Sequence, residues 1–381
     1  MKKSNYSFVL TSFFIWLAVL LFIIFLSTRL LPLQANFLGG GLANYVKNPY
    51  LWAFGNYDGE HYVSIARLGY GFGEQAFFPL YPVLIGLVSK IFGSTILSYN
   101  ISGIVISLMS FLIGLIGFYK LLRIDFSEKV TRLAIVALLI FPTSFYFGAV
   151  YTESLFFTLT IWALLMARQK KWLAASLIAM LLTATRFVGI IIIPVILVEW
   201  LVSIWKNRDW FKKIPWAVLI APIGLLSYML FLLKKVGDPF AFFNTLASFG
   251  EQRSSHLILL PQVFYRYMVK ILPALHTTFW PTLFTTYLEF VIGLLFLIII
   301  CLSFKKLRLS YWFFLLFGYL IPTFSGSFSS LPRYVLVLFP TYILVGLMAA
   351  KSKKVFFAIA TISFILLVVS FSLFARGYWV S

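Results

Sequence analysis

Residues 57–82 read Tyr-Asp-Gly-Glu-His-Tyr-Val-Ser-Ile-Ala-Arg-Leu-Gly-Tyr-Gly-Phe-Gly-Glu-Gln-Ala-Phe-Phe-Pro-Leu-Tyr-Pro, and they stand out from the apolar sequence around them. The stretch holds three of the eleven carboxylates, Asp58, Glu60 and Glu74, and one of the three histidines, His61. Because the chain has so few polar residues, this group of four indicates a place where a ligand binds or chemistry occurs. The same polarity predicts a large loop between membrane-spanning helices rather than a span.

The rest of the chain has the composition of a polytopic membrane protein. Of its 381 residues, 62% are hydrophobic and 11% are charged, whereas soluble domains carry about 25% charged residues. The formal net charge is +20, but the basic residues lie in short clusters between apolar runs. That pattern is typical of cytoplasmic loops and argues against nucleic acid as a partner. A single cysteine, Cys301, excludes a disulfide framework, and three scattered histidines predict no metal site.

The basic clusters predict a single all-α domain, residues 1–381, with about eleven membrane-spanning helices surrounded by membrane lipids. We expect the helices at about 8–26, 97–120, 131–149, 155–168, two between 172 and 205, 214–233, 286–304, 310–324, 335–350 and 355–374. Lys2 and Lys3 predict a cytoplasmic N-terminus of a multi-pass cell-membrane protein. Residues 30–95 and 234–285 then form the first and second outer loops, and the C-terminus also lies outside.

The predicted topology depends on whether two apolar segments, 80–92 and 172–205, span the membrane and how often. The run 80–92 has only about 13 residues, too few to span, so we expect it to lie in the membrane interface or to re-enter. The segment 172–205 is interrupted by Thr185 and Arg186 and has basic clusters on both sides. We expect two short helices with Arg186 near the outer turn. The alternative is one long tilted helix, which would invert the topology of everything after it.

The two-helix interpretation collects most acids at the outer side. Those outside or at the outer boundary are Asp58, Glu60, Glu74, Glu153, Asp238, Glu251 and Glu289. A membrane protein with its acids on one face is expected to have its active site there.

The outer acids include candidate catalytic groups. A carboxylate such as Asp58 or Glu60 can take a proton from a sugar hydroxyl as that hydroxyl attacks an activated anomeric carbon. The alternative is that Asp58, Glu60 and His61 merely solvate a loop. Glu153 lies in Tyr-Thr-Glu-Ser, residues 151–154, where it could bind acceptor hydroxyls. In the other interpretation, Thr152 or Ser154 caps the following helix and Glu153 complements its positive end.

Two arginines are candidates for binding a phosphate. Arg186 lies between two apolar runs, and a charge at membrane depth costs about 2.5–3.5 kcal/mol, so we expect it to bind a lipid phosphate or to pair with Glu153. The alternative is that its side chain snorkels to the membrane interface. Arg333 stands at the outer end of the helix predicted at 335–350, where the positive-inside rule does not favour it. A phosphate partner explains this position. The alternative is an interfacial anchor formed by Arg333 and Tyr334.

Several motifs together resemble the PIG-V type mannosyltransferases, which add the second mannose to glycosylphosphatidylinositol anchors in eukaryotes and have prokaryotic relatives. The matching positions are Asp58, Gly59, His61, Tyr62, Ile65, Ala66, Gly69 and Tyr70, then Phe77-Phe78-Pro79-Leu80-Tyr81-Pro82, Tyr151-Thr152-Glu153-Ser154-Leu155-Phe156, Gly237-Asp238-Pro239 with Ala241-Phe242, and Arg333-Tyr334 with Phe339-Pro340. They span about residues 52–340 in the family's order, and the first motif is the specific one. Tyr57 departs from the family, which commonly has Trp there.

The resemblance implies a GT-C fold, in which a large first outer loop carries interfacial helices. It also implies an inverting transfer from a polyprenyl-phosphate sugar donor, with no metal and no cofactor, and it places the GT-C base on Asp58. The acceptor does not carry over, because the short cytoplasmic loops and compact length look prokaryotic. A glycan or glycolipid acceptor is therefore expected without being identified.

These inferences combine into one hypothesis, a polyprenyl-phosphate-mannose-dependent transferase that acts on the outer face. Asp58 is the expected base, and the roles of Asp58 and Glu60 could be reversed. Expected substrate-binding residues are Glu60, His61, Tyr81, Glu153, Arg186, Arg333 and Tyr334. The competing hypothesis is a lipid or lipid-linked-sugar flippase, which the break at Arg186 fits but the absence of internal repeats does not. A third hypothesis is an assembly subunit that has no activity of its own. The sequence does not identify a protein partner.

Overall fold

The computed structural model describes residues 4–204, 215–245, 256–276 and 278–380. Lys2, Lys3 and Glu251, which entered the topology predictions, lie outside these ranges, and so does part of the predicted second outer loop. Over the described residues the regular structure is helical throughout, with no strand, so the all-α prediction is confirmed.

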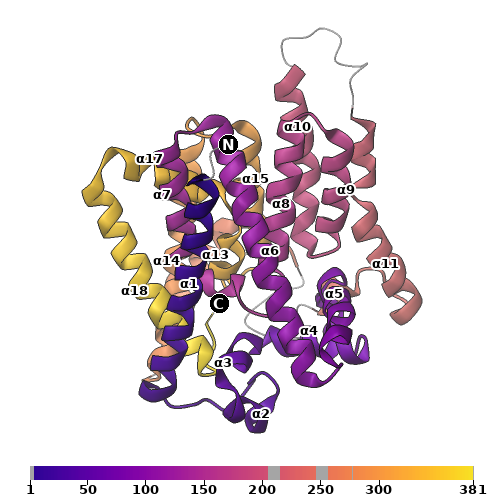
Figure 1. Cartoon of the computed structure of the whole chain (residues 1–381), viewed down its shortest axis with the longest axis vertical. Coiled ribbons are helices and arrows are strands. Elements are labelled where there is room, and N and C mark those ends of the chain that lie inside the picture. The colour runs from indigo at the N-terminus through magenta and orange to yellow at the C-terminus, as the bar shows by residue number, and fades with distance from the viewer. Residues whose placement is uncertain (1–3, 205–214, 246–255, 277, 381) are drawn as a thin grey trace.

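Long and short helices both occur along the chain, and their labels are those of Figure 1. The first part of the chain holds α1 Ser4–Leu30, α2 Gly41–Lys47, α3 Pro49–Trp52, η1 Ala53–Gly55, α4 Asp58–Leu68, η2 Glu74–Ala76, α5 Leu80–Ser89, η3 Lys90–Phe92, α6 Ile96–Asp125, α7 Glu128–Leu139, η4 Ser144–Phe147, α8 Glu153–Arg168, α9 Trp172–Thr183, η5 Phe187–Ile191 and α10 Ile192–Ile204. The second part holds η7 Trp216–Ile220, α11 Ile223–Val236, α12 Ala241–Asn244, α13 Leu260–Tyr265, the π-helical turn η9 Arg266–Ile271, α14 Trp280–Ser303, α15 Leu309–Thr323, α16 Leu331–Leu336, α17 Pro340–Lys351 and α18 Lys353–Ala375.

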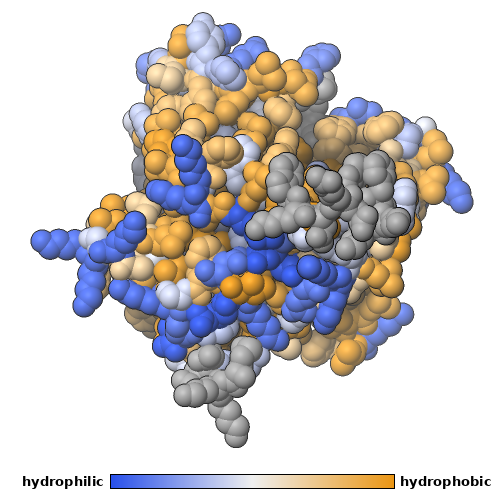
Figure 2. All heavy atoms as spheres, turned by 90° about the horizontal axis from the view of Figure 1, so that it is seen from above, coloured by the Kyte–Doolittle hydropathy of each residue, from blue (hydrophilic) through white to orange (hydrophobic). Residues whose placement is uncertain are grey.

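The long helices run roughly parallel to one axis of the molecule (Figure 1). α1 lies beside α18, and α6 packs against α8. The short helices α2 to α5 gather at one end, which we call the loop end and define by residues 31–95. The opposite end, called the far end, carries hydrophilic side chains across its middle, with hydrophobic side chains around them (Figure 2). A polar end face with apolar side chains around it is expected of a membrane protein.

Six helical segments in the described part of the chain are long and apolar enough to cross a membrane. They are Tyr6–Leu30, Ile96–Asp125, Phe187–Ile204, Trp216–Val236, Trp280–Ser303 and Lys353–Ala375. Shorter apolar helices are Leu80–Phe92, Trp172–Thr183 and Leu309–Thr323. The multi-pass prediction is confirmed, whereas the count of eleven spans stays a prediction.

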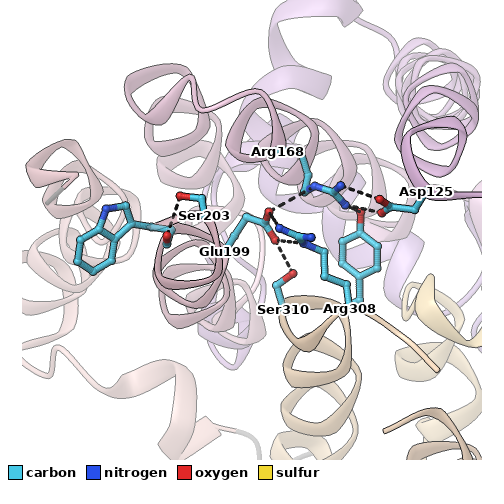
Figure 3. Close-up of polar contacts among 8 residues, drawn as sticks. Asp125, Arg168, Glu199, Ser203, Arg308 and Ser310 are labelled. Atoms are coloured by element: carbon cyan, nitrogen blue, oxygen red, sulfur yellow. Dashed lines mark hydrogen bonds and ion pairs between the residues drawn. The ribbon is translucent and has the colours of Figure 1, made fainter. Parts of the chain in front are cut away.

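An ion network at the far end settles how the segment 172–205 folds. The carboxylate of Glu199, near the end of α10, accepts hydrogen bonds of 2.6 and 2.7 Å from Arg308 and lies 3.3 Å from Nε of Arg168 (Figure 3). Arg168 ends α8 and also donates a 2.8 Å hydrogen bond to Asp125 at the end of α6. Since α10 returns to the end at which α8 stops, α9 and α10 form a hairpin. The two-helix prediction is confirmed, and the single long helix is wrong.

Two predicted helices are interrupted where proline occurs. The helix expected at 131–149 stops at Leu139, before Pro142, and the helix expected at 335–350 becomes α16 and α17, with Pro340 beginning the second piece. Proline lacks the N–H that a helix interior needs and disfavours a helical residue before it. The predictions of continuous helices were therefore wrong at these two places. Pro222 changes the helix type from η7 to α11, but Trp216–Val236 is still one helical segment long enough to span, as predicted at 214–233.

Candidate active site

Asp58 begins α4 at the loop end, and an unusual backbone conformation precedes it. Tyr57 has φ of 56° and ψ of −120°, a combination that crowds Cβ in any residue other than glycine. The Tyr57 N–H donates to the carbonyl of Phe37 at 3.0 Å, and its hydroxyl donates to the carbonyl of Gly377 at 2.6 Å. Contacts from two distant parts of the chain therefore hold the strained residue and fix the position of Asp58.

Asp58 is one end of a chain of four charged side chains. Nη1 of Arg333 donates a hydrogen bond to Oδ2 of Asp58, and Nε of Arg333 lies 3.5 Å from Oε1 of Glu153. The same Oε1 accepts a hydrogen bond of 2.7 Å from Nη1 of Arg186. The side chains of Arg333 and Glu153 are only 7% and 1% exposed. Carboxylate and guanidinium groups thus alternate along the chain, which offsets the cost of burying each charge.

Aromatic rings surround the two arginines. The guanidinium carbon of Arg333 lies 5.3 Å from the ring centroids of Tyr151 and Tyr334 and 5.7 Å from that of Tyr146. The guanidinium carbon of Arg186 lies 4.8 Å from the ring centroid of Tyr334. At these distances the negative ring faces attract the cations and partly replace the water that burial removes. Tyr334 therefore contacts both arginines and links them.

The hydrogen bonds of the turn before α8 show whether Thr152 or Ser154 caps this helix. If Thr152 or Ser154 capped the helix, a side-chain oxygen would accept a hydrogen bond from a backbone N–H in the first turn. Thr152 makes no such bond, and the Ser154 hydroxyl instead donates to the carbonyl of Phe147 at 2.6 Å. The interpretation in which Thr152 or Ser154 caps α8 is therefore wrong. Glu153 does lie in the first turn of α8, and its carboxylate pairs with Arg186 and Arg333.

The chain of charges opens onto a cavity of about 1040 Å³. Predicted site residues that line it are Asp58, Glu60, His61, Arg186, Arg333 and Tyr334. Apolar and aromatic side chains make up much of the rest of the wall, among them Phe77, Phe78, Phe187, Val188, Phe242, Phe243, Ile321 and Pro322. The shape and lining are those of a site for a large amphipathic ligand with a charged group.

Two other predicted site residues beside Asp58 face the same cavity but lie outside the chain of charges. Burial raises the pKa of Glu60 above its usual value, and the nearby His61 partly opposes this rise. The ring of His61 stacks on Phe77, with the centroids 4.8 Å apart, and its Nδ1 lies 3.4 Å from Oε1 of the buried Glu74. His61 thus contacts the loop that follows α4 while one side of it lines the cavity.

Tyr81 and Glu153 do not contribute to the lining of this cavity. Tyr81 is fully buried, and its hydroxyl lies 2.9 Å from the carbonyl of Gly103 and 2.7 Å from the hydroxyl of Ser107, both in α6. Its ring meets that of Tyr62 edge-on, with the centroids 5.2 Å apart. In this structure Tyr81 joins α5 to α6 and supports α4 from behind.

The cavity also contains residues to which sequence reasoning assigned no role. Glu289 of α14 is buried, lines the cavity and accepts a hydrogen bond of 3.0 Å from the Tyr267 hydroxyl. An acid inside an apolar helix is a signal that could have identified Glu289. Trp379 and Tyr378, which follow α18, line the cavity as well. No sequence pattern marks these two aromatic residues.

Comparisons with known proteins agree with this geometry. The chain is similar in structure to ArnT from Cupriavidus metallidurans, crystallised bound to undecaprenyl phosphate, with a TM-score of 0.52 and 15% sequence identity. The alignment covers 91% of this chain and 61% of that chain, so the protein spans less than two thirds of the length of ArnT. ArnT is a GT-C glycosyltransferase, and the likeness confirms the predicted GT-C fold.

A comparison with curated protein sequences found no match. A sequence model of the family described as mannosyltransferase (PIG-V), however, matches residues 7–247. This range is more than half of the chain, and it includes the loop end with Asp58, the turn with Glu153, and Arg186. The protein therefore belongs to the mannosyltransferase (PIG-V) family.

Proposed function

We propose that the protein transfers mannose from a polyprenyl-phosphate mannose donor to a lipid-linked or surface glycan on the outer face of the cell membrane, with inversion at the anomeric carbon. The observation that carries the proposal is the pairing of Asp58 with Arg333 at the wall of a large, partly apolar cavity. In this pair the candidate base, Asp58, lies next to the side chain that we assign to the donor phosphate, Arg333. The family match supports the sugar, and the ligand of ArnT supports the kind of lipid.

The two arginines are assigned to the donor phosphate. Arg333 and Arg186 both line the cavity, and the guanidinium fork suits two oxygens of one phosphate. Negative charge grows on the leaving phosphate as the glycosidic bond breaks, so cations held in place beforehand stabilise the transition state. Glu153, bound to both arginines and removed from the cavity wall, is assigned to positioning them.

Asp58 is assigned the role of general base. In the proposed step, the acceptor O–H gives its proton to a carboxylate oxygen of Asp58 while the acceptor oxygen bonds to the anomeric carbon. The bond from that carbon to the phosphate oxygen breaks, and its electron pair leaves with polyprenyl phosphate. Attack from the face opposite the leaving group inverts the configuration. Glu60 and His61, which line the cavity beside Asp58, are assigned to sugar hydroxyls.

An apolar path next to Arg186 suits the prenyl chain of the donor. Phe187 and Val188 of η5 and Pro322 of α15 line the main cavity on this flank. A second cavity, of only about 10 Å³, adjoins it beside Arg186, Val188 and Pro322 and is too small for an isoprene unit. We therefore assign the first isoprene units of a lipid whose phosphate contacts Arg186 to the apolar flank of the main cavity, where burial of apolar surface favours them.

The proposed chemistry assigns the stabilisation of charge to the arginines and needs no bound metal. Among the described residues, no three His, Cys, Asp or Glu side chains are close enough to hold a metal ion. We therefore expect EDTA to leave the transfer rate unchanged, and restoration of activity by Mg²⁺ or Mn²⁺ after EDTA treatment would contradict this assignment.

The deciding experiment uses the purified protein in proteoliposomes with radiolabelled polyprenyl-phosphate mannose and a membrane lipid extract as acceptor. Label in a new glycolipid product supports the transferase, and Asp58→Asn provides the inactive control. Movement of the donor across the bilayer without a labelled product would instead identify a flippase. Absence of both, with intact donor binding, would contradict catalysis by this chain alone and favour an assembly subunit.

A further inference from the structure

The segment after α18, residues 376–380, turns back into the molecule and forms part of the cavity wall. Val380, the last residue that the structure describes, is fully buried. Gly377, with φ of 78°, makes the turn. Hydroxyl groups from three different elements anchor the segment through its carbonyl groups: Tyr57 to Gly377 at 2.6 Å, Thr285 to Trp379 at 2.9 Å and Tyr146 to Val380 at 2.5 Å.

Trp379 presents its indole ring to the cavity. The residue is half-buried, and its ring meets that of Tyr57 edge-on, with the centroids 5.0 Å apart and the planes at 72°. Tyr57 is itself packed by Phe37, at 5.5 Å, and by Phe374, at 6.1 Å. Among the described residues, no ring stacks on a face of the Trp379 indole. Tyr57 therefore packs against the ring of Trp379, and the half-buried Trp379 is exposed in part to the cavity that it lines.

The contacts give an order across the site. Trp379 touches Tyr57, which precedes Asp58 in the chain, and Asp58 pairs with Arg333. Arg333 is joined through Glu153 to Arg186. In this series of contacts Asp58 and Arg333 stand between Trp379 and Arg186, and all four residues line the cavity.

This order fits the geometry of displacement with inversion. In such a reaction the acceptor oxygen and the leaving phosphate oxygen lie on opposite sides of the anomeric carbon. If the phosphate binds at Arg333 and Arg186, the acceptor belongs at the opposite end of the order, beside Trp379.

We propose that Trp379 is the platform on which a pyranose ring of the acceptor packs; this deepens the proposed function and rests on it for the direction of transfer. The face of an aromatic ring carries partial negative charge, whereas the C–H groups on one face of a pyranose carry partial positive charge. The hydroxyl groups at the sugar's edge need polar partners. Gln34 and Asn36, which line the cavity and whose backbone carbonyl oxygens approach Gly377, are assigned to these hydroxyl groups.

The test measures sugar binding separately from transfer. Purified full-length protein in nanodiscs is mixed with methyl α-D-mannopyranoside, and binding is followed by saturation-transfer NMR. Binding of radiolabelled undecaprenyl phosphate is measured in parallel. We expect Trp379→Ala to weaken binding of the mannoside about tenfold and to leave binding of the lipid phosphate unchanged. Trp379→Phe should retain most of the affinity, because it keeps an aromatic face.

Trp280→Ala is the matched control. Trp280 is an exposed tryptophan at the start of α14 and does not line the cavity, so its replacement should change neither ligand's affinity. Unchanged mannoside binding in Trp379→Ala, no saturation transfer from the wild-type protein to the mannoside, or a parallel loss of lipid binding would each overturn the proposed role of Trp379.

A transfer assay shows whether the sugar that packs on Trp379 belongs to the acceptor or to the donor. A higher KM for the acceptor in Trp379→Ala, with an unchanged KM for the donor, supports the acceptor site, whereas a change confined to the donor would contradict it. Mannoside binding that depends on Trp379 in a protein without transferase activity would refute the proposed function and leave sugar recognition intact.

Discussion

Arg333 donates a hydrogen bond to the carboxylate of Asp58, a residue 275 positions earlier in the chain. A carboxylate bound to a guanidinium group is a weaker base than a free one. A donor phosphate that attracts Arg333 would therefore weaken its hold on Asp58 and increase the basicity of this carboxylate. In this way the pairing would couple arrival of the donor to activation of the base and would limit reaction before the donor is bound.

Replacement of Arg333 should weaken donor binding. Loss of a charge-assisted hydrogen bond costs about 1.5–3 kcal/mol, so Arg333→Ala should lower the apparent affinity for undecaprenyl phosphate about ten- to a hundredfold. Because this change also leaves the buried Glu153 with one partner fewer, Arg333→Lys serves as a second variant that keeps the charge and loses the planar fork. Unchanged donor affinity in both variants would return Arg333 to the role of an interfacial anchor.

Asp58→Asn should abolish transfer while the protein still inserts and binds its donor. The change keeps the size of the side chain and one acceptor oxygen but removes the basic oxygen, and loss of a general base costs about 10²–10⁴-fold in rate. Rates of label transfer at saturating donor provide the measurement, and retention of undecaprenyl phosphate binding shows that the site is intact. Full activity in Asp58→Asn would overturn the assignment of the base.

Glu60→Gln should reduce activity less than Asp58→Asn does. Glu60 lines the cavity, has a raised pKa because it is partly buried, and lies outside the chain of charges. If Glu60 only orients a sugar hydroxyl, its amide can replace part of that contact, and KM should change more than kcat. If Glu60→Gln is inactive while Asp58→Asn retains full activity, the two roles are reversed.

The far-end network should govern stability and not donor binding. Glu199 is 2% exposed and is bound to Arg308, Arg168 and Ser310 (Figure 3). Removal of one partner of a buried ion pair costs about 3–5 kcal/mol, so Glu199→Gln should lower the unfolding temperature in detergent. Undecaprenyl phosphate affinity, measured below that temperature, should match the wild type. A selective loss of donor affinity with unchanged unfolding temperature would show that the two ends are coupled.

Local patterns in the sequence were sufficient to predict which segments are helical and where the main break falls. The interruption at Thr185 and Arg186 correctly separated two helices, because a charge between apolar runs is a local signal. Proline breaks at positions such as 142 and 340 were local signals too, but the apolar run on either side hid them. The sequence therefore predicted the architecture better than the helix boundaries.

The arrangement of the site depends on contacts that no local pattern records. Asp58 and Arg333 were each singled out, but their pairing joins the first loop to α16. The pair of Arg186 with Glu153 was one of several alternatives, and the structure selects it. Trp379 reaches the cavity only because the segment after α18 turns back, and this turn depends on hydroxyl donors from three distant elements.

The orientation in the membrane can be tested with single cysteines at the two ends. Both substitutions belong in a Cys301→Ser background, because Cys301 is exposed in α14. Val46 is 65% exposed in α2 at the loop end, and Lys306 is exposed between α14 and α15 at the far end. The basic-loop asymmetry predicts that the loop end faces outward. We therefore expect Val46→Cys to react with an impermeant maleimide in intact cells and Lys306→Cys to react only after permeabilisation. The opposite pattern would place the cavity on the cytoplasmic side, where the donor and acceptor would have to be cytoplasmic lipids. That result would contradict the proposed outer-face reaction. It would leave the proposed roles of Asp58 and Arg333 unchanged.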